Sequence, residues 1–400
     1  MYQLTDEIRN WISEHIADEP TKLRLAWHNK APWINAAINH IENFKNTRRK
    51  FNSTFPGSEK LLPEYMPIKI STEQASSTPT AFLHRELAEL EGVNSPTILD
   101  MTCGLGIDTS FLGSIPNANI TTIELNEDIW LVAKNNFAHR SNIEVINADS
   151  VEFLKNTKQH YNLIFIDPAR RDSSGGRVFN LHDCNPDVIE ILSLLKQHGD
   201  KIMIKMSPML DVTQTIRDLP GIVSLHIIEL QGECRELLAI IEDKQLIENP
   251  KIFVWRNGDI VFSFTHEEET AANVFNSMPA KGYYLYEPSA AIMKAAPFKL
   301  LSQQYMIGQL GNNTHLYTSE KYIPDFPGAI YEIDDVLPYS SSVIKNIARQ
   351  KLKADVAVRN FSISAQDLKK RLKIQSSGDL RIMGVTTADN KPYLLLLNKR

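Results

Sequence analysis

Polar residues stand where apolar, strand-like segments end in the first half of the chain. Residues 97–100, Thr-Ile-Leu-Asp, end in Asp100 and lead into a turn that contains Gly104 and Gly106. Glycine adopts positive φ and lets a ligand approach the backbone, so a glycine turn between a strand and a helix can hold a nucleotide. The glycine pair alone fits an ordinary strand-to-helix turn equally well, and the strand ends that follow decide between the two interpretations.

Two later strand ends carry carboxylates that suit a nucleoside. The segment 119–124 ends in Glu124, 18 residues beyond Gly106, where an acid can accept hydrogen bonds from a ribose diol. The segment 143–146 leads to Asp149, which is placed to bond an exocyclic amine such as that of adenine. Together with the glycine turn, these residues predict a nucleotide site at the carboxyl edge of a parallel sheet.

This set of strand ends resembles the class I S-adenosylmethionine-dependent methyltransferases over roughly residues 70–245. The resemblance implies an α/β, Rossmann-like core and S-adenosylmethionine as the cofactor. It also implies that the cofactor-binding residues are Asp100, Thr102, Gly104, Gly106, Asp108, Glu124, Leu125, Asp149, Ser150 and Asp167. A nicotinamide cofactor is less expected, because Thr109 stands where a Gly-x-Gly-x-x-Gly motif has its third glycine.

A fourth apolar segment, residues 161–166, ends in Asp167 and Pro168, and the proline stops the strand because it cannot donate to the ladder. In the family that the chain resembles, this strand end faces the methyl group and the substrate. Asp167, Pro168 and Arg170 are therefore the candidate catalytic residues, with Asp167 orienting the target and Arg170 contacting a base or a phosphate. The alternative is that Arg170 only caps a turn or forms an ion pair.

The cysteines and histidines offer little further chemistry. Methylation of a pyrimidine carbon needs a thiol near the end of the fourth or fifth strand, and Met206-Ser207-Pro208 after the expected fifth strand has none. His182 and Asp183 are a possible acid–base pair, although a loop histidine is more often structural. The three cysteines are scattered, so neither a disulfide framework nor a cysteine-based zinc site is expected: Cys103, Cys184 and Cys234.

The composition is that of an ordinary globular protein of two to four domains, with 400 residues, 42% apolar and 23% charged. The first residues have neither a basic start nor an apolar core, and no run approaches the ~18 apolar residues of a membrane span. We therefore expect a cytoplasmic protein with no membrane partner and no metal.

The net charge of −5 hides an asymmetry. Residues 341–400 contain 13 Lys or Arg against 4 Asp or Glu, and the preceding residues contain 30 against 44. A basic module appended to an acidic core favours a polyanionic partner, here RNA. The alternative is a solvated basic surface that binds nothing.

The C-terminal part carries a second resemblance. Residues 367–373, Asp-Leu-Lys-Lys-Arg-Leu-Lys, with the strands that follow are similar to a THUMP-like module found behind certain bacterial methyltransferase cores, and residues 286–291 resemble the start of a ferredoxin-like segment. True THUMP domains bind RNA, so the resemblance implies an RNA-modifying enzyme. The expected domains are a helical domain (1–70), a methyltransferase core (71–245), a β-hairpin extension with a ferredoxin-like segment (246–335) and a basic THUMP-like domain (336–400).

Periodicity and turn residues predict the elements after the core. Asn257-Gly258 predicts a hairpin between residues 251–255 and 259–264. Helices are expected at 290–300, 341–350 and 365–372, and strands at 282–286, 314–318, 329–333, 355–359, 381–386 and 393–397.

The sequence thus predicts an S-adenosylmethionine-dependent methyltransferase that acts on RNA, at a base nitrogen. Two alternatives remain open. One is an RNA-binding protein without activity whose cofactor pocket is a relic, because Ala169 and Arg170 replace the usual Pro and aromatic residue of the fourth-strand motif. The other is a methyltransferase for a small molecule or a protein.

Overall fold

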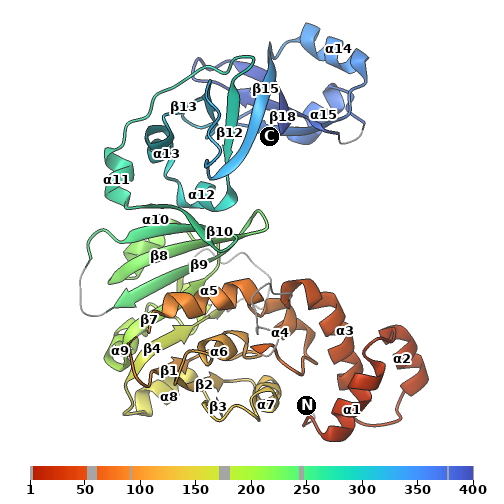
Figure 1. Cartoon of the computed structure of the whole chain (residues 1–400), viewed down its shortest axis with the longest axis vertical. Helices are drawn as coiled ribbons and strands as arrows, with labels where there is room; N and C mark the ends of the chain where they lie inside the picture. Colours follow the sequence, from red (N-terminus) through yellow and green to blue (C-terminus); the bar gives the residue numbers. More distant parts are fainter. Residues whose placement is uncertain are drawn as a thin grey trace. The chain divides into compact units, whose positions relative to one another are not determined.

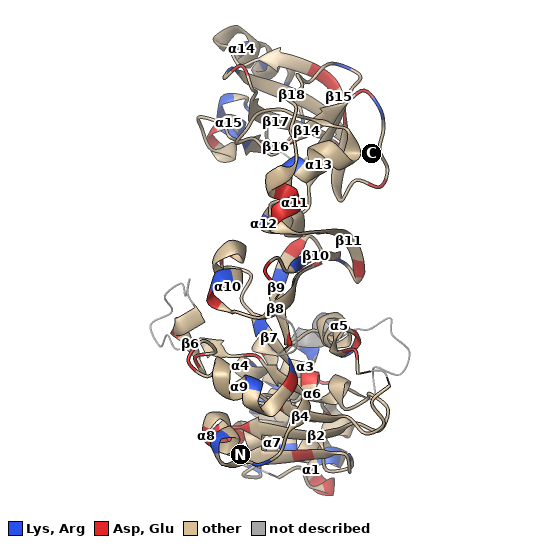
Figure 2. Cartoon of the chain, turned by 90° about the vertical axis from the view of Figure 1, so that its left-hand side faces the viewer, with Lys and Arg blue, Asp and Glu red and all other residues tan. Residues whose placement is uncertain are grey.

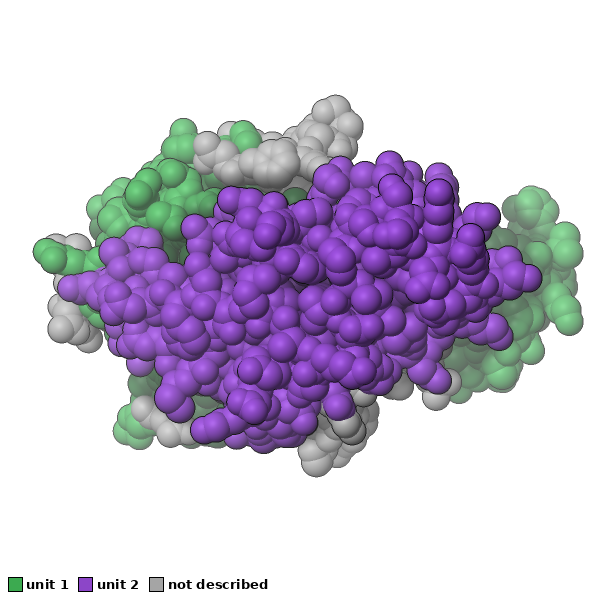
Figure 3. Space-filling model, turned by 90° about the horizontal axis from the view of Figure 1, so that it is seen from above, with its two compact units in different colours: residues 1–228, 236–248 green, residues 229–235, 249–400 purple. Residues whose placement is uncertain are grey.

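The computed structural model describes residues 3–51, 61–90, 92–170, 181–242, 247–375 and 378–399. The chain forms two compact units (Figure 3). The first consists of residues 1–228 and 236–248, and the second of residues 229–235 and 249–400. Each unit is described by itself below.

The first unit contains a mostly parallel sheet (Figure 1). Its strands are β1 (Thr97–Asp100), β2 (Asn119–Glu124), β3 (Ile143–Asn147), β4 (Tyr161–Ile166), β7 (Gly199–Met206), β8 (Ile222–Leu230) and β9 (Glu233–Glu242). They lie in the order β8-β9-β7-β4-β1-β2-β3, with β9 antiparallel to β7. The chain order reverses between β1 and β4, and doubly wound sheets bind ligands at such a switch point. The α/β, Rossmann-like fold expected from the sequence is confirmed.

Within its described residues, the first unit has ten α-helices that accompany this sheet. They are α1 (Asp6–His15), α2 (Pro20–Trp27), α3 (Ile34–Phe51), α4 (Lys69–Gln74), α5 (Thr78–Ala88), α6 (Ile107–Leu112), α7 (Glu127–Asn136), α8 (Ser150–Asn156), α9 (Leu192–His198) and α10 (Val212–Asp218). The helices before β1 share one apolar core with the turn that follows β1, since Ile8 and Trp11 belong to the same cluster as Leu105 and Phe111. That packing gives the glycine turn a rigid support.

The second unit begins with the hairpin that Asn257-Gly258 predicts, β10 (Lys251–Arg256) and β11 (Asp259–Phe264). The elements that follow are α11 (His266–Ala271), β12 (Tyr284–Pro288), α12 (Ala290–Ala295), α13 (Phe298–Tyr305), β13 (Gly308–Gln309), β14 (Tyr317–Ser319), β15 (Gly328–Pro338), α14 (Ser341–Gln350), β16 (Ala354–Arg359), α15 (Ala365–Arg371), β17 (Leu380–Thr386) and β18 (Pro392–Lys399). Seven of these strands form a sheet in the order β13-β14-β12-β15-β18-β17-β16.

Alternating apolar residues give this second sheet two buried faces. Met383 and Leu395 belong to one cluster, whereas their neighbours Ile382 and Leu394 belong to the other. The second cluster also contains Ile347 of α14 and residues of α15, so these two helices cover the same face of the sheet. Their remaining surfaces are left to solvent.

Two expectations for this unit are wrong. The single helix expected at 290–300 is two helices, because Ala296 has φ of 61° and Pro297 has no N–H to continue the helical ladder. The strand expected from residue 314 begins at Tyr317, since the Thr314 N–H closes a turn onto the Gly311 carbonyl at 3.0 Å. No helix in the described residues is long and apolar enough to cross a membrane.

Candidate functional site

The predicted site residues meet at the carboxyl edge of the first sheet. Asp100 is in register with Thr122 of β2 and Phe165 of β4, and Glu124 is in register with Asn147 of β3. Because these strands are parallel, their ends lie side by side at one edge. The structure therefore brings together the strand ends that carry Asp100, Glu124, Asp149 and Asp167.

The two glycines of the turn have different roles. Gly106 has φ of 83°, and a Cβ there would lie 2.4 Å from the ring of Phe137. Gly104 has φ of 56°, and no atom lies within 4 Å of the place where its Cβ would be. Gly106 is thus needed for packing, while Gly104 leaves open space where a ligand can approach the backbone.

Glu124 and Asp149 lie beside this turn with capacity to accept further hydrogen bonds. The Glu124 carboxylate accepts the N–H groups of Gly104 and Asn126, each at 2.9 Å. Asp149 is exposed and caps α8 with one oxygen, Oδ1, which accepts two backbone N–H groups at 2.8 and 3.0 Å. Leu125 is 63% exposed, and Ser150 is buried at the start of α8.

Asp100 lies inside the turn and is 0% exposed. Its Oδ1 accepts the N–H of Thr102 at 3.0 Å, and its Oδ2 accepts the Thr109 hydroxyl. Burial raises the pKa of Asp100 to about 6, although these hydrogen bonds oppose the shift. The Thr102 hydroxyl in turn accepts the backbone N–H of Asp167 at 2.8 Å, so Thr102 ties the turn to the end of β4.

A chain of buried polar side chains runs from Asp108 to Asp167. Asp108 accepts hydrogen bonds from the ring of His84 at 2.7 Å and from the Ser76 hydroxyl at 2.6 Å. Lys205 donates to Ser76 Oγ at 2.9 Å and to Asp167 Oδ2 at 2.6 Å. The other ring nitrogen of His84 faces Glu236. Asp108 is thus a member of this network.

The network holds its members in charged forms. Burial alone would lower the pKa of His84, but Glu236 and Asp108 outweigh it and raise that pKa to about 10. Burial would raise the pKa of Asp108, yet His84 and Lys205 lower it to about 2. Burial disfavours the Lys205 cation, and the carboxylates around it raise its pKa regardless. At neutral pH His84 and Lys205 are therefore cations and Asp108 is an anion.

We expect replacement of His84 by Gln to change how stability depends on pH. The pKa of His84 is higher in the folded protein, about 10, than the unfolded value of 6.5. Its stabilising contribution is therefore complete below about pH 6.5 and is lost as the pH rises through 10. Chemical denaturation from pH 6 to 10 should show a decline in the free energy of unfolding that His84→Gln lacks. His160→Gln, which removes an exposed partner of Asp200, is the control and should keep the decline.

Four members of the network were not predicted from the sequence: Ser76, His84, Lys205 and Glu236. Two residues could have indicated buried polar contacts. Lys205 interrupts the apolar run of β7, and His84 lies among apolar residues of α5. A charged side chain in a buried run needs a partner. The sequence does not say which partner, since these residues come from separate stretches of the chain.

The substrate-side residues are only partly described. Pro168 lies two residues beyond the end of β4, and the following β5 (Ala169–Arg170) pairs antiparallel with β6 (Cys184–Asn185). The side chain of Arg170 lies outside the described residues, as does all of Arg171. His182 Nδ1 bonds to Asp187 Oδ2 at 2.9 Å, so the histidine has a carboxylate partner other than the expected Asp183.

The cysteine near the site is not a nucleophile. Cys103 is buried in the glycine turn, and its burial raises the pKa of the thiol far above the ordinary range. A thiol held protonated attacks poorly, because the thiolate is the reactive form. The structure therefore gives Cys103 a buried, packed position and no reactive thiolate.

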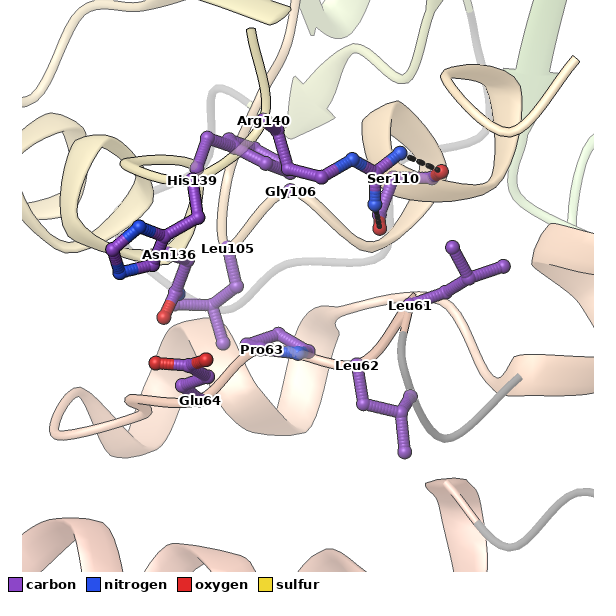
Figure 4. Close-up of a pocket in the computed structure, with 11 residues that line it drawn as sticks. Leu61, Leu62, Pro63, Glu64, Leu105, Gly106, Ser110, Asn136, His139 and Arg140 are labelled. Atoms are coloured by element: carbon purple, nitrogen blue, oxygen red, sulfur yellow. Dashed lines mark hydrogen bonds between the residues drawn. The ribbon is translucent and has the colours of Figure 1, made fainter. Parts of the chain in front are cut away.

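A pocket of about 160 Å³ lies on another side of the glycine turn (Figure 4). Leu61, Leu62, Pro63 and Glu64 line one side, and the Arg140 guanidinium donates to Ser110 on the other. Of the described residues that line it, none is an acid from a strand end. This pocket is distinct from the carboxyl edge of the sheet.

Two known domain families match the C-terminal part of the chain. A ferredoxin-like domain matches residues 284–327, and a THUMP domain-like family matches residues 328–399. No curated protein matches the sequence. The two domain matches confirm the resemblance that residues 286–291 and 367–373 suggested.

Solved structures match the whole chain or part of it. The crystal structure of a candidate methyltransferase from Porphyromonas gingivalis W83 is 29% identical, with a TM-score of 0.85, and the match covers 100% of both chains. A candidate class I S-adenosylmethionine-dependent methyltransferase from Listeria monocytogenes is 10% identical, covers 63% of this chain and 94% of that chain, and has a TM-score of 0.39. A protein from M. capricolum in complex with S-adenosyl-homocysteine is 16% identical over 41% of this chain and 69% of that chain, with a TM-score of 0.32.

Of these three similarities, only the one to the Porphyromonas gingivalis protein is close, since the TM-scores of the other two are 0.39 and 0.32. It spans both units, and the sheet of the first unit has the strand order and the antiparallel β9 described above. The chain therefore joins the class I methyltransferase fold to a C-terminal ferredoxin-like domain and a THUMP-like domain.

Proposed function

We propose that this protein is an S-adenosylmethionine-dependent methyltransferase that acts on a base nitrogen in RNA. The observation that carries the proposal is the carboxyl edge of the first sheet. There an open glycine turn, two carboxylates with free acceptor capacity and the Asp167-Pro168 strand end lie together on a class I methyltransferase fold. This arrangement offers a nucleoside site with a polar acceptor beside it.

The residues fit S-adenosylmethionine. The open space at Gly104 admits the ligand to the backbone, Glu124 would accept the ribose hydroxyls, and the free oxygen of Asp149 would accept the adenine amine. The exposed Leu125 would cover the base. Asp100, Thr102, Gly106, Asp108 and Ser150 act by shaping the turn and the helix starts. The cofactor supplies a methyl group on a positively charged sulfur, which becomes a neutral thioether.

Asp167 is the proposed catalytic residue. Its carboxylate is 36% exposed, and Lys205 occupies only one of its oxygens. The other oxygen, Oδ1, can accept a hydrogen bond from an amine and so hold the nitrogen in position for attack. Pro168 fixes the strand end, and we assign Arg170 to contact with the base or its phosphate.

The second unit supplies a surface suited to RNA. Residues 341–375 contain nine Lys or Arg against two Asp or Glu (Figure 2). We call the cations of this segment that form no ion pair within the described residues the basic face: Lys345, Arg349, Lys351, Lys353, Lys369, Arg371 and Lys373. All come from α14, α15 and their connections, outside the apolar cluster that these helices bury. Lysines and arginines of one domain that form no ion pair can bind the phosphates of a nucleic acid.

The direct test is transfer of labelled methyl groups from S-adenosylmethionine. Total RNA, total protein and the small-molecule fraction from a strain that lacks this protein would be offered separately. We expect label in RNA, removed by ribonuclease and found in a base methylated on nitrogen. Label in the protein or small-molecule fraction instead, or no label despite cofactor binding in calorimetry, would contradict the proposal.

Replacement of Gly106 by Ala should weaken cofactor binding about tenfold or more. The alanine must adopt φ of 83° and displace the Phe137 ring, and both strain the turn that meets the ligand. Gly232→Ala is a matched control, because Gly232 has φ of 81° but open space around the position of a Cβ. Calorimetry with S-adenosyl-homocysteine should show the loss only for Gly106→Ala. Equal affinities in the two variants would show that the turn does not hold the cofactor.

A further inference from the structure

Lys205 connects the catalytic edge to the buried network. Its ammonium group donates to Asp167 Oδ2 at 2.6 Å and to Ser76 Oγ at 2.9 Å. The side chain is 12% exposed, so water screens these contacts only slightly. Ser76 is itself held by Asp108, which fixes the place from which Lys205 reaches Asp167.

The charges around Asp167 come from several elements. Burial raises the pKa of Asp167, and the negative charges of Asp108 on α6 and Glu236 on β9 raise it further. Among the described residues, Lys205 on β7 lowers it, by its charge and by its hydrogen bond. The hydroxyl of the nearby Thr102 accepts the backbone N–H of Asp167, so this hydrogen bond holds the main chain of Asp167 and not its carboxylate.

We propose that Lys205 is a positioning residue that holds Asp167 Oδ2 and keeps the carboxyl group ionised. Oδ1 is then left to accept a hydrogen bond from the nitrogen that receives the methyl group. The inference rests on the proposed function and makes it more specific. An acceptor that meets an ionised Asp167 must offer an N–H donor, because a carboxylate only accepts hydrogen bonds. The target is therefore a nitrogen that carries hydrogen, such as an exocyclic amine.

The alternative is that Lys205 and Asp167 form an ion pair that only stabilises the fold. The two possibilities differ in what happens to Asp167 when the cation is removed. A positioning cation controls the ionisation of Asp167, whereas a purely structural pair would change folding stability and leave the pH dependence of catalysis unmoved.

The chain offers a close control in Lys201. It lies four residues earlier on the same strand, about 13 Å away along β7. It is also buried, and it donates to the Ala88 carbonyl at 3.1 Å and pairs with Glu89 and Glu242. Replacing Lys201 by Met removes a buried, paired lysine from the same sheet without touching Asp167.

The experiment measures the pKa of the Asp167 carboxyl in the full-length protein, by NMR of carboxyl-labelled aspartate, with Asp167→Asn to assign the signal. In Lys205→Met we expect this pKa to rise by about one to three units. It should stay at the wild-type value in Lys205→Arg, which keeps the charge, and in Lys201→Met. Should Lys205→Met fail to fold, Ser76→Ala removes the second contact of Lys205 and should produce a smaller rise.

Activity gives a second, independent readout. The acidic limb of the kcat profile should move to higher pH in Lys205→Met, so that the loss of rate at pH 7 is recovered as the pH rises. If the pKa of Asp167 is unchanged in Lys205→Met, the proposal is wrong, whatever the effect of the substitution on the reaction rate. If the wild-type protein transfers no methyl group at all, the proposed function fails, while the titration still decides the role of Lys205.

Discussion

Replacing Asp167 by Asn is expected to lower the rate of methyl transfer to RNA by about a hundredfold or more. Asparagine keeps the shape of the side chain but removes the charge that aligns the acceptor nitrogen. Lys205 would also lose its anionic partner at 2.6 Å. Because Asp167 acts mainly on the acceptor, the affinity for S-adenosyl-homocysteine should stay within a few-fold of the wild-type value.

The measurement is kcat and KM with labelled cofactor, beside calorimetry on the same preparations. Asp200→Asn is the control, because Asp200 lies at the opposite end of β7 and bonds to His160 and Asn162. This control should retain wild-type rates. A normal rate in Asp167→Asn would show that the fourth-strand acid does not orient the substrate.

The second large effect is expected on RNA binding. Replacing Lys345, Arg349, Lys369 and Lys373 of the basic face together by Gln should weaken RNA binding about a hundredfold at low salt. It should also reduce the slope of log K against log salt concentration by about three, because each phosphate contact to a single strand contributes ~0.7. Glutamine is a good helix former, so α14 and α15 should persist.

A control with the same change of charge separates local contacts from overall electrostatics. Lys22, Lys134, Lys155 and Lys158 are exposed lysines of the first unit. Their combined replacement by Gln should leave the salt slope nearly unchanged. Equal losses in the two quadruple variants would mean that RNA responds to net charge alone and that α14 and α15 are not its binding surface.

The sequence predicted the parts of the fold that depend on local pattern. The strands that end at Asp100, Glu124 and Ile166 are buried apolar runs followed by turn residues, and the Asn257-Gly258 hairpin has its own turn signal. Helix α14 has the expected bounds because a serine caps it and its apolar residues recur at helical spacing. The break at Pro297 was also visible in the sequence, yet the apolar pattern on both sides obscured it.

The buried network could not be predicted in the same way. Ser76 and His84 lie in one stretch of the chain, whereas Lys205 and Glu236 come from two stretches far from it, and only the tertiary fold brings all four to Asp108 and Asp167. The family resemblance implied that Asp108 binds the cofactor, but it does not show that a neighbouring helix and strand satisfy that carboxylate. These buried charges are paired between distant segments of the chain, so motif spacing could not predict this part of the site.

The most direct test compares the modified nucleosides of cellular RNA in four strains: wild type, a strain lacking this protein, and that strain complemented with wild-type protein or with Asp167→Asn. We expect nucleoside mass spectrometry to find one base, methylated on an amino nitrogen, that is lost without the protein and restored only by the wild-type chain. Identical nucleoside profiles in all four strains, from a protein that binds S-adenosylmethionine, would contradict an RNA methyltransferase.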